Sequence, residues 1–243
     1  MHPYRRTRTA AKLLLGVFAA LALLLAPAQA SASAPVTNHP AAQAAPNADN
    51  GNPTAAQLLA KVSGKCDQVS TGAYSNKNGG KAPICASGNA YYWTSGMAID
   101  CDGQTTTQCN KNTDCCYQPD TSFHQSDGKP LSAAVLPYVV IPLPGKIWSY
   151  KKAGLKGGDV VVVIYKGQVE YAVFGDEGPN TSIGEASYAT AKALGIDDNP
   201  KTGGTAGPVT YIVFKNSVVS PIESHPNAVT SGRTLATQFV NGS

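Results

Sequence analysis

Three carboxylates lie close together in the segment "YAVFGDEGPNTSIGEASYATAKALG" (171–195), namely Asp176, Glu177 and Glu185. A strand end and a helix start, joined by the eight residues between Asp176 and Glu185, can bring these two carboxyls to one side of a cleft. Glycoside hydrolysis needs such a pair, in which one carboxyl protonates the leaving oxygen and the other activates water or attacks directly. Glu177 should point the opposite way, into solvent.

The same acids also have a purely structural interpretation. Ser182-Ile183-Gly184-Glu185 fits the S-x-x-E capping box, so Glu185 would bond back to the start of a helix over 183–194 that stops at Gly195. Asp176 would bond the backbone of a Gly-Pro turn, as aspartates in turns often do. The residues alone favour the cap and the turn.

Four apolar runs predict the strands that would position these acids. The run at 159–165 is apolar at nearly every position and should be buried on both faces. Lys166-Gly167 follows it as a candidate two-residue hairpin turn. The four runs are "VLPYVVI" (135–141), "DVVVVIY" (159–165), "QVEYAVF" (168–174) and "VTYIVFK" (209–215).

Helices are few in this pattern. Asn52 should cap a short helix that has Pro53 in its first turn and stops at Gly64. A second helix is expected at 183–194, and regular βαβ alternation is absent. The pattern predicts a mainly β barrel with one or two short helices.

The first 52 residues should not belong to that barrel. Residues 1–30 have a basic start, a short apolar core and the small-x-small site Ala28-Gln29-Ala30, which predict a secretory signal peptide. Residues 31–52 are rich in Ala, Pro, Ser and Asn without aromatics, which is typical of a disordered linker. We therefore expect an extracellular protein with one catalytic domain at 53–243 and no membrane span.

Charge narrows the range of partners. Residues 31–243 carry 15 basic and 15 acidic side chains, so the net charge of +4 comes from the leader. No basic stripe remains that would indicate a nucleic-acid partner. Any electrostatic specificity must therefore be local.

All six cysteines lie between residues 66 and 116. An even count in an exported protein favours disulfides that staple a loop-rich N-terminal part, with 15 possible pairings. Zinc ligation is the alternative, although adjacent Cys115 and Cys116 and the absence of C-x-x-C speak against it. A Cys115–Cys116 bond would be strained and unusual.

Two sequence blocks resemble the family 75 glycoside hydrolases, which are secreted chitosanases of fungi and actinomycetes. The resemblance covers about residues 60 to 220. The first block is G-D-x-G-P followed by I-G-E-x-S, matched by Gly175, Asp176, Gly178, Pro179, Ile183, Gly184, Glu185 and Ser187. The second is M-x-I-D-C-D-G, matched by Met97, Ile99, Asp100, Cys101, Asp102 and Gly103.

The resemblance implies a six-stranded double-psi β-barrel that cleaves β-1,4-linked glucosamine polymers internally, with inversion and without a cofactor or metal. Asp176 and Glu185 would be the catalytic pair, with carboxyls about 6.5–9.5 Å apart to admit a water. We favour Glu185 as general acid and Asp176 as general base. The swapped roles stay open, because a helix N-terminus would tend to keep Glu185 ionised.

The resemblance implies that the substrate is chitosan or glucosamine oligomers. We expect the protein to be a monomer. Chitosan carries ammonium groups, so carboxylates should line the groove. We take Asp100 and Asp102 to project to opposite faces, with Asp100 facing the cleft, unless both merely stabilise the turn at Cys101. Tyr138 and Trp148 are candidate sugar platforms, and core positions are the alternative.

Two other function classes compete with hydrolysis. A non-hydrolytic, expansin-like polysaccharide-binding barrel would share the strands and aromatics without needing both acids. A disulfide-stapled inhibitor or effector would use the acids only as turn and cap. The motifs G-x-S-x-G and H-E-x-x-H do not occur, and His225 is expected in a solvated loop.

Overall fold

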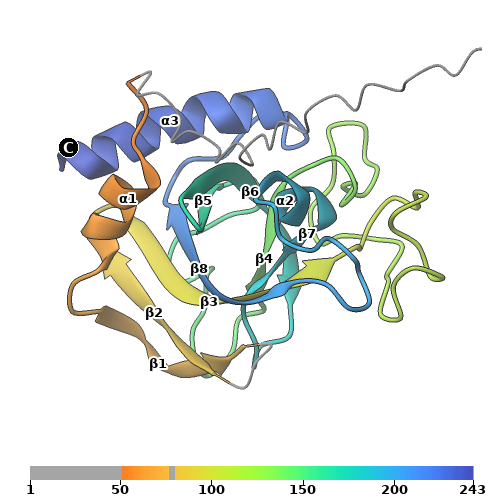
Figure 1. Cartoon of the computed structure of the whole chain (residues 1–243), viewed down its shortest axis with the longest axis horizontal. Helices are drawn as coiled ribbons and strands as arrows, with labels where there is room; N and C mark the ends of the chain where they lie inside the picture. The colour runs from red at the N-terminus through yellow and green to blue at the C-terminus, as the bar shows by residue number, and fades with distance from the viewer. Residues whose placement is uncertain (1–50, 77–79, 243) are drawn as a thin grey trace, which may run out of the picture. The chain divides into compact units, whose positions relative to one another are not determined.

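The computed structural model describes residues 51–76 and 80–242 (Figure 1). The predicted signal peptide and nearly all of the predicted linker lie outside these residues. Eight strands form one sheet in the order β1-β2-β3-β7-β4-β6-β5-β8, and a further β3–β8 pairing closes the last six into a barrel. The strands are β1 (Asp67–Ser75), β2 (Lys81–Ser87), β3 (Ala90–Asp100), β4 (Tyr138–Pro142), β5 (Val160–Tyr165), β6 (Gln168–Gly178), β7 (Glu185–Ser187) and β8 (Thr205–Phe214).

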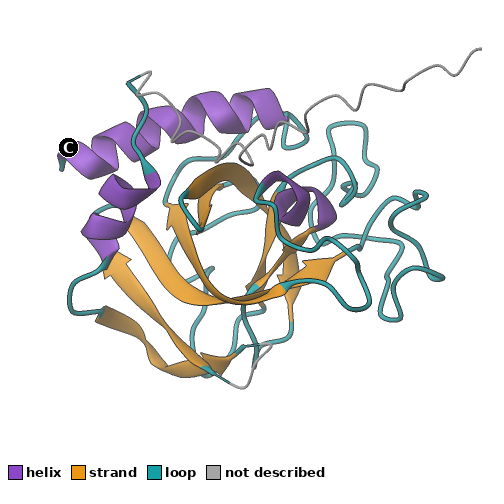
Figure 2. Cartoon of the chain, viewed as in Figure 1, coloured by secondary structure: helices purple, strands orange, loops and turns teal. Residues whose placement is uncertain are grey.

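The predicted six-stranded barrel is thus confirmed. Its β3–β7 and β4–β6 pairings are parallel and the other four are antiparallel. The double-psi topology stays a prediction. Figure 2 shows long loops beside the barrel, the largest of which joins β3 to β4 through residues 101–137.

The β5 strand is buried on both faces, as its composition predicts. Val161 and Val163 belong to a hydrophobic cluster that draws residues from all six barrel strands, which identifies it as the barrel interior. Val160 and Val162 belong to a second cluster on the outer face. The hairpin turn is also confirmed, since Lys166 and Gly167 both have positive φ, at 45° and 82°.

The outer face is covered by a helix that was not expected from the sequence. Helix α3 (His225–Asn241) packs against β5 and β6 and contacts α1 (Ala55–Val62) (Figure 1). Its buried residues are the small Ala228, Gly232 and Ala236, spaced four apart on one face.

The prediction of a solvated loop at His225 is wrong, because the unexpected helix α3 begins at this residue. The His225 Nε2 lies 2.7 Å from the Glu170 carboxylate on β6.

The first helix begins two residues later than expected. Thr54, rather than Asn52, caps α1 and forms a capping box with Gln57. Within the described residues, no helix has the length and apolar character needed to cross a membrane.

The capping box predicted at Glu185 is wrong. Residues Glu185–Ser187 form β7, and α2 (Tyr188–Ala193) begins only after them. The N-cap is Ser187, whose Oγ accepts the Thr190 N–H at 3.2 Å. Glu185 is therefore a strand residue, positioned by pairing with other strands.

Two disulfides stabilise the N-terminal part, where the sequence predicted disulfides without giving their pairing. Cys66 is bonded to Cys85, and Cys101 is bonded to Cys109 across the start of the β3–β4 loop. Cys115 and Cys116 carry exposed free thiols.

Candidate functional site

Asp176 and Glu185 are brought to one level of the sheet by a shared neighbour. Val140 on β4 pairs in register with Asp176 on β6 and with Glu185 on β7. Residues in register on adjacent strands point to the same face, so both carboxylates share the face of Val140. Val140 packs in the outer cluster, which places both acids outside the barrel, on the face that the β3–β4 loop borders.

A β-bulge turns Asp176 to this outer face. Phe174 pairs with Val139 and faces the barrel interior, whereas Asp176, rather than Gly175, pairs with Val140. Simple alternation from Phe174 would place Asp176 inside. Gly175 is the extra residue, and such bulges re-aim a side chain.

Asp176 is held firmly in this position. It is 5% exposed, and its Oδ1 accepts the backbone N–H groups of Ser122, at 2.8 Å, and Glu177, at 2.7 Å. Burial raises the pKa of Asp176, while the hydrogen bonds from Ser122 act in the opposite direction. The β3–β4 loop thus fixes one of the two acids.

Glu185 is half-buried and also pairs with Ala98 of β3. Its Oε2 lies near Gly178, where an added Cβ would come within 3.7 Å of that oxygen. The two ends of the segment from Asp176 to Glu185 therefore return to each other across β4.

Asp100 joins this pair through the parallel pairing of β3 with β7. It lies opposite Ser187, two positions beyond the Ala98–Glu185 pair, and so on the same face as Glu185. It is 5% exposed, and burial, followed by the charges of Glu185, Asp102 and Asp176, raises its pKa well above the usual value.

Asp102 is the fourth acid near Asp176, Glu185 and Asp100. Its Oδ1 accepts the Gln118 N–H at 2.6 Å, and its own N–H donates to Asp100 Oδ1 at 2.7 Å. Burial, with a contribution from the charge of Asp176, raises the pKa of Asp102 to about 6. The expectation of opposite faces for Asp100 and Asp102 is wrong, because β3 ends at Asp100 and the chain then turns so that the Asp102 N–H bonds back to the Asp100 carboxylate.

We refer to Asp100, Asp102, Asp176 and Glu185 as the acid cluster. Among the described residues, no salt bridge joins Asp100, Asp102 or Asp176 to a basic side chain. The charges of neighbouring acids in the cluster help to raise the pKa values of Asp100 and Asp102. The cluster is thus suited to proton transfer and to binding a cation.

Tyr138 and Trp148, the two candidate sugar platforms, are buried in the core, which was the alternative interpretation for both. Tyr138 is fully buried, and its hydroxyl donates to the Asp102 carbonyl at 3.1 Å. Trp148 is 8% exposed and packs edge-to-face on Tyr91 with ring centroids 5.4 Å apart. Tyr138 supports the acid cluster from beneath, and Trp148 packs in the barrel interior.

Sequence reasoning missed one polar group that holds Asp176 and misjudged the surroundings of Glu177. Ser122 reaches it from the β3–β4 loop, 54 residues away in the chain, and no local pattern marks that residue. Glu177 points away from Asp176 as expected but is not simply solvated, because it is half-buried and accepts a hydrogen bond from the Tyr150 hydroxyl. Tyr150 packs in the barrel interior.

One group of potential metal ligands was found in the described part of the chain. Ligand atoms of Asp114, Cys115 and Cys116 lie within 4.8 Å of one another. These residues are adjacent in the β3–β4 loop and do not include a member of the acid cluster.

Comparison with known proteins gives consistent matches. A family model described as "Fungal chitosanase of glycosyl hydrolase group 75" matches residues 97–238, more than half of the chain and the whole acid cluster. Endo-chitosanase C of Aspergillus oryzae is 34% identical over 154 residues, which are 61% of this chain and 38% of that protein. The match therefore spans well under half of that relative's length.

Two further relatives are covered more fully. Endo-chitosanase B of Aspergillus oryzae (strain ATCC 42149 / RIB 40) is 27% identical over 191 residues, 69% of this chain and 78% of that protein. An endo-chitosanase of Aspergillus fumigatus is 29% identical over 154 residues, 56% of this chain and 63% of that protein.

Proposed function

The chain belongs to glycosyl hydrolase group 75, and from this we propose that it is an endo-chitosanase. It hydrolyses β-1,4 linkages between glucosamine units with inversion, using Asp176 and Glu185 as its acid/base pair and no cofactor. The relatives named endo-chitosanases support the substrate, and the acid cluster supports the chemistry.

The pairing of Val140 with both acids is the observation that carries this proposal. Two strand spacings of about 4.8 Å separate the Cα atoms of Asp176 and Glu185 by roughly 9–10 Å. Side chains that project from one face at this separation suit the range of about 6.5–9.5 Å for inverting carboxyls. A water fits between such groups and attacks from the face opposite the leaving oxygen.

We assign the general base to Asp176. Two backbone N–H donors fix its carboxylate and favour the ionised form, while burial strengthens it as a base by raising its pKa. It takes a proton from the attacking water as that water bonds to the anomeric carbon.

We assign the general acid to Glu185, which gives its proton to the glycosidic oxygen as the carbon–oxygen bond breaks. The earlier objection from the helix dipole is weaker here, since Glu185 precedes α2 in a strand and Ser187 caps that helix. Asp100 lies on the same face as Glu185, and the charge of Glu185 helps to raise the pKa of Asp100.

The substrate assignment rests on charge. A chain of ammonium-bearing sugars complements Asp100 and Asp102, which form no salt bridge with a basic side chain in the described part of the chain, so we propose that they contribute to its attraction. Tyr138 acts indirectly, by supporting Asp102.

We further propose that the protein is exported as a monomer with a catalytic domain at 53–243. Residues 1–30 would be removed as a signal peptide, and 31–52 would form a linker. N-terminal sequencing of protein recovered from culture medium is expected to begin at Ser31. Retention of residues 1–30 in that protein would contradict the cleavage.

Reducing-end release from chitosan tests the catalytic pair. Asp176→Asn and Glu185→Gln should each lower kcat at least about 10²-fold, as loss of an acid or base does. Thermal melts of both variants should accompany the assay, because a folded and inactive variant is the informative result. Full activity in both variants would sink the proposal, and chitosan binding without release by the wild type would favour the expansin-like alternative.

A further inference from the structure

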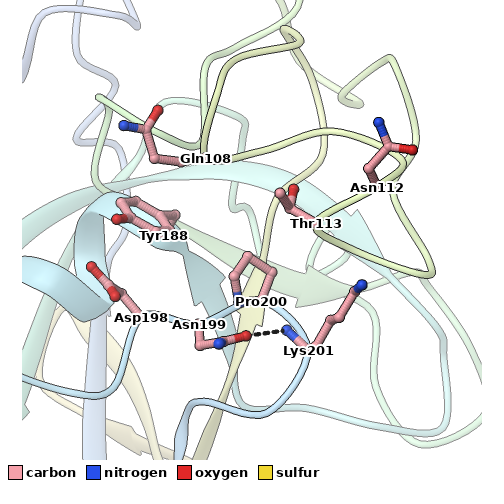
Figure 3. Close-up of a pocket in the computed structure, with 8 residues that line it drawn as sticks. All are labelled: Gln108, Asn112, Thr113, Tyr188, Asp198, Asn199, Pro200 and Lys201. Carbon is pink, nitrogen blue, oxygen red and sulfur yellow. Dashed lines mark hydrogen bonds between the residues drawn. The ribbon is translucent and has the colours of Figure 1, made fainter. Parts of the chain in front are cut away.

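A pocket of about 410 Å³ lies between the β3–β4 loop and the loop that follows α2 (Figure 3). Its volume falls within the range of about 300–1,000 Å³ that is typical of small-molecule sites. The side chains that define its chemistry are Gln108, Asn112, Thr113, Tyr188, Asp198 and Lys201.

The pocket adjoins the acid cluster through both of its walls. Tyr188 follows Glu185 by three residues, so their Cα atoms lie within about 11 Å. Gln108 precedes Cys109, whose disulfide to Cys101 ties this wall to the end of β3 beside Asp100. Both walls of the pocket are therefore joined by short covalent links to the strands that carry Asp100 and Glu185.

The two ends of the pocket differ in chemistry. Figure 3 shows Tyr188 and Asp198 together at one side, while the Lys201 amine extends away from them on the other. Figure 3 shows the Tyr188 hydroxyl beside the Asp198 carboxylate, and burial together with this carboxylate raises the pKa of the Tyr188 hydroxyl.

This set of groups matches one class of ligand. An amino sugar offers an apolar ring face to an aromatic side chain, an ammonium to a carboxylate, and hydroxyls to amides. Tyr188 and Asp198 supply the first two at one end, while Gln108 and Asn112 supply amides and Thr113 a hydroxyl along the other wall.

We propose that this pocket is a glucosamine-binding subsite, separate from the reacting pair, in which Asp198 binds the C2 ammonium and Tyr188 packs against the sugar ring. Lys201 disfavours the reverse orientation of the sugar because it would meet the ammonium with a like charge. The subsite rests on the proposed chitosanase function and extends it to a defined place on the protein.

Steady-state kinetics on a glucosamine hexamer test the subsite with a matched pair of variants. Asp198→Asn removes the carboxylate, whereas Asp197→Asn makes the same charge change one residue away, at an exposed position outside the pocket lining. We expect Asp198→Asn to raise KM about tenfold with kcat within twofold of wild type, as loss of a charge-assisted contact does. Asp197→Asn should leave both constants within twofold.

Calorimetry measures the affinity of each variant for a glucosamine tetramer, which tests the subsite independently of whether the protein cleaves chitosan. If the wild type does not cleave chitosan, the proposed function fails, yet weaker tetramer binding by Asp198→Asn than by Asp197→Asn would still support the pocket. If the wild type cleaves chitosan and the two variants show equal KM and equal tetramer affinity, the subsite is wrong while the function stands.

Discussion

Gly175 lies so close to Tyr138 that an added Cβ would come within 2.5 Å of the Tyr138 Cβ. It would also lie 2.9 Å from Leu131 Cδ1. Because Gly175 is the extra residue of the bulge, this contact and the outward direction of Asp176 are parts of one arrangement. The glycine is required by close packing against the outer cluster.

Gly175→Ala should therefore reduce both stability and activity. Overpacking at this site is expected to lower the free energy of unfolding by about 1–3 kcal/mol and to displace Asp176. Urea unfolding and chitosan hydrolysis measure the two effects. Gly72→Ala is the matched control, since an added Cβ at that position in β1 meets nothing within 4 Å. Equal behaviour of the two variants would show that the bulge tolerates a side chain.

Ser187→Ala should destabilise the protein more than loss of an ordinary helix cap. The buried Ser187 Oγ accepts the N–H groups of Tyr138, at 3.0 Å, and Thr190, and donates to the Leu136 carbonyl at 2.8 Å. Its loss leaves buried backbone groups unpaired, for a cost of about 2–3 kcal/mol.

Ser224→Ala provides the comparison for that variant, because Ser224 caps α3 at an exposed position. Its expected cost is about 1 kcal/mol or less. Similar unfolding free energies for the two variants would contradict a joint role of Ser187 in β4, β7 and α2.

The acid cluster should make the protein less stable as pH rises through the weakly acidic range. The pKa of Asp102 is about 6 in the folded protein and roughly 3.9 in an unfolded chain, so between these values the folded state binds more protons. Stability from this group is therefore fully present below about pH 4 and is lost as pH rises through 6. The raised pKa values of Asp100 and Asp176 act in the same direction.

Thermal melts between pH 4 and pH 7 check this dependence. Asp102→Asn should flatten the decline of Tm with pH relative to wild type. Asp127→Asn is the control, since the Lys129 contact lowers the pKa of this exposed acid and its removal should not flatten the decline. An unchanged decline in Asp102→Asn would show that Asp102 does not titrate as its surroundings require.

Local sequence patterns predicted the elements that depend on local physics. The continuous apolar run of β5 indicated burial on both faces, and Lys166-Gly167 indicated the turn that follows it. Helix α3 escaped detection because its buried stripe consists of Ala and Gly, which carry little of the apolar signal that marks a helix face.

The structure of the site depended on contacts between distant residues. Ser182 and Glu185 have capping-box spacing, but pairing with Ala98 and Val140 places Glu185 in a strand instead. Tertiary pairing overrides such local preferences routinely. The resemblance predicted Asp176 and Glu185 as the catalytic pair, whereas their placement with Asp100 required the β3–β7 pairing, which joins segments nearly 90 residues apart.

The anomeric configuration of the first product tests the central claim most directly. Proton NMR can follow wild-type hydrolysis of a glucosamine hexamer before the new reducing ends mutarotate. The proposed roles of Asp176 and Glu185 require inversion, so the β-linkage should first yield the α-anomer. Initial appearance of the β-anomer would indicate retention and would contradict the assigned roles of Asp176 and Glu185.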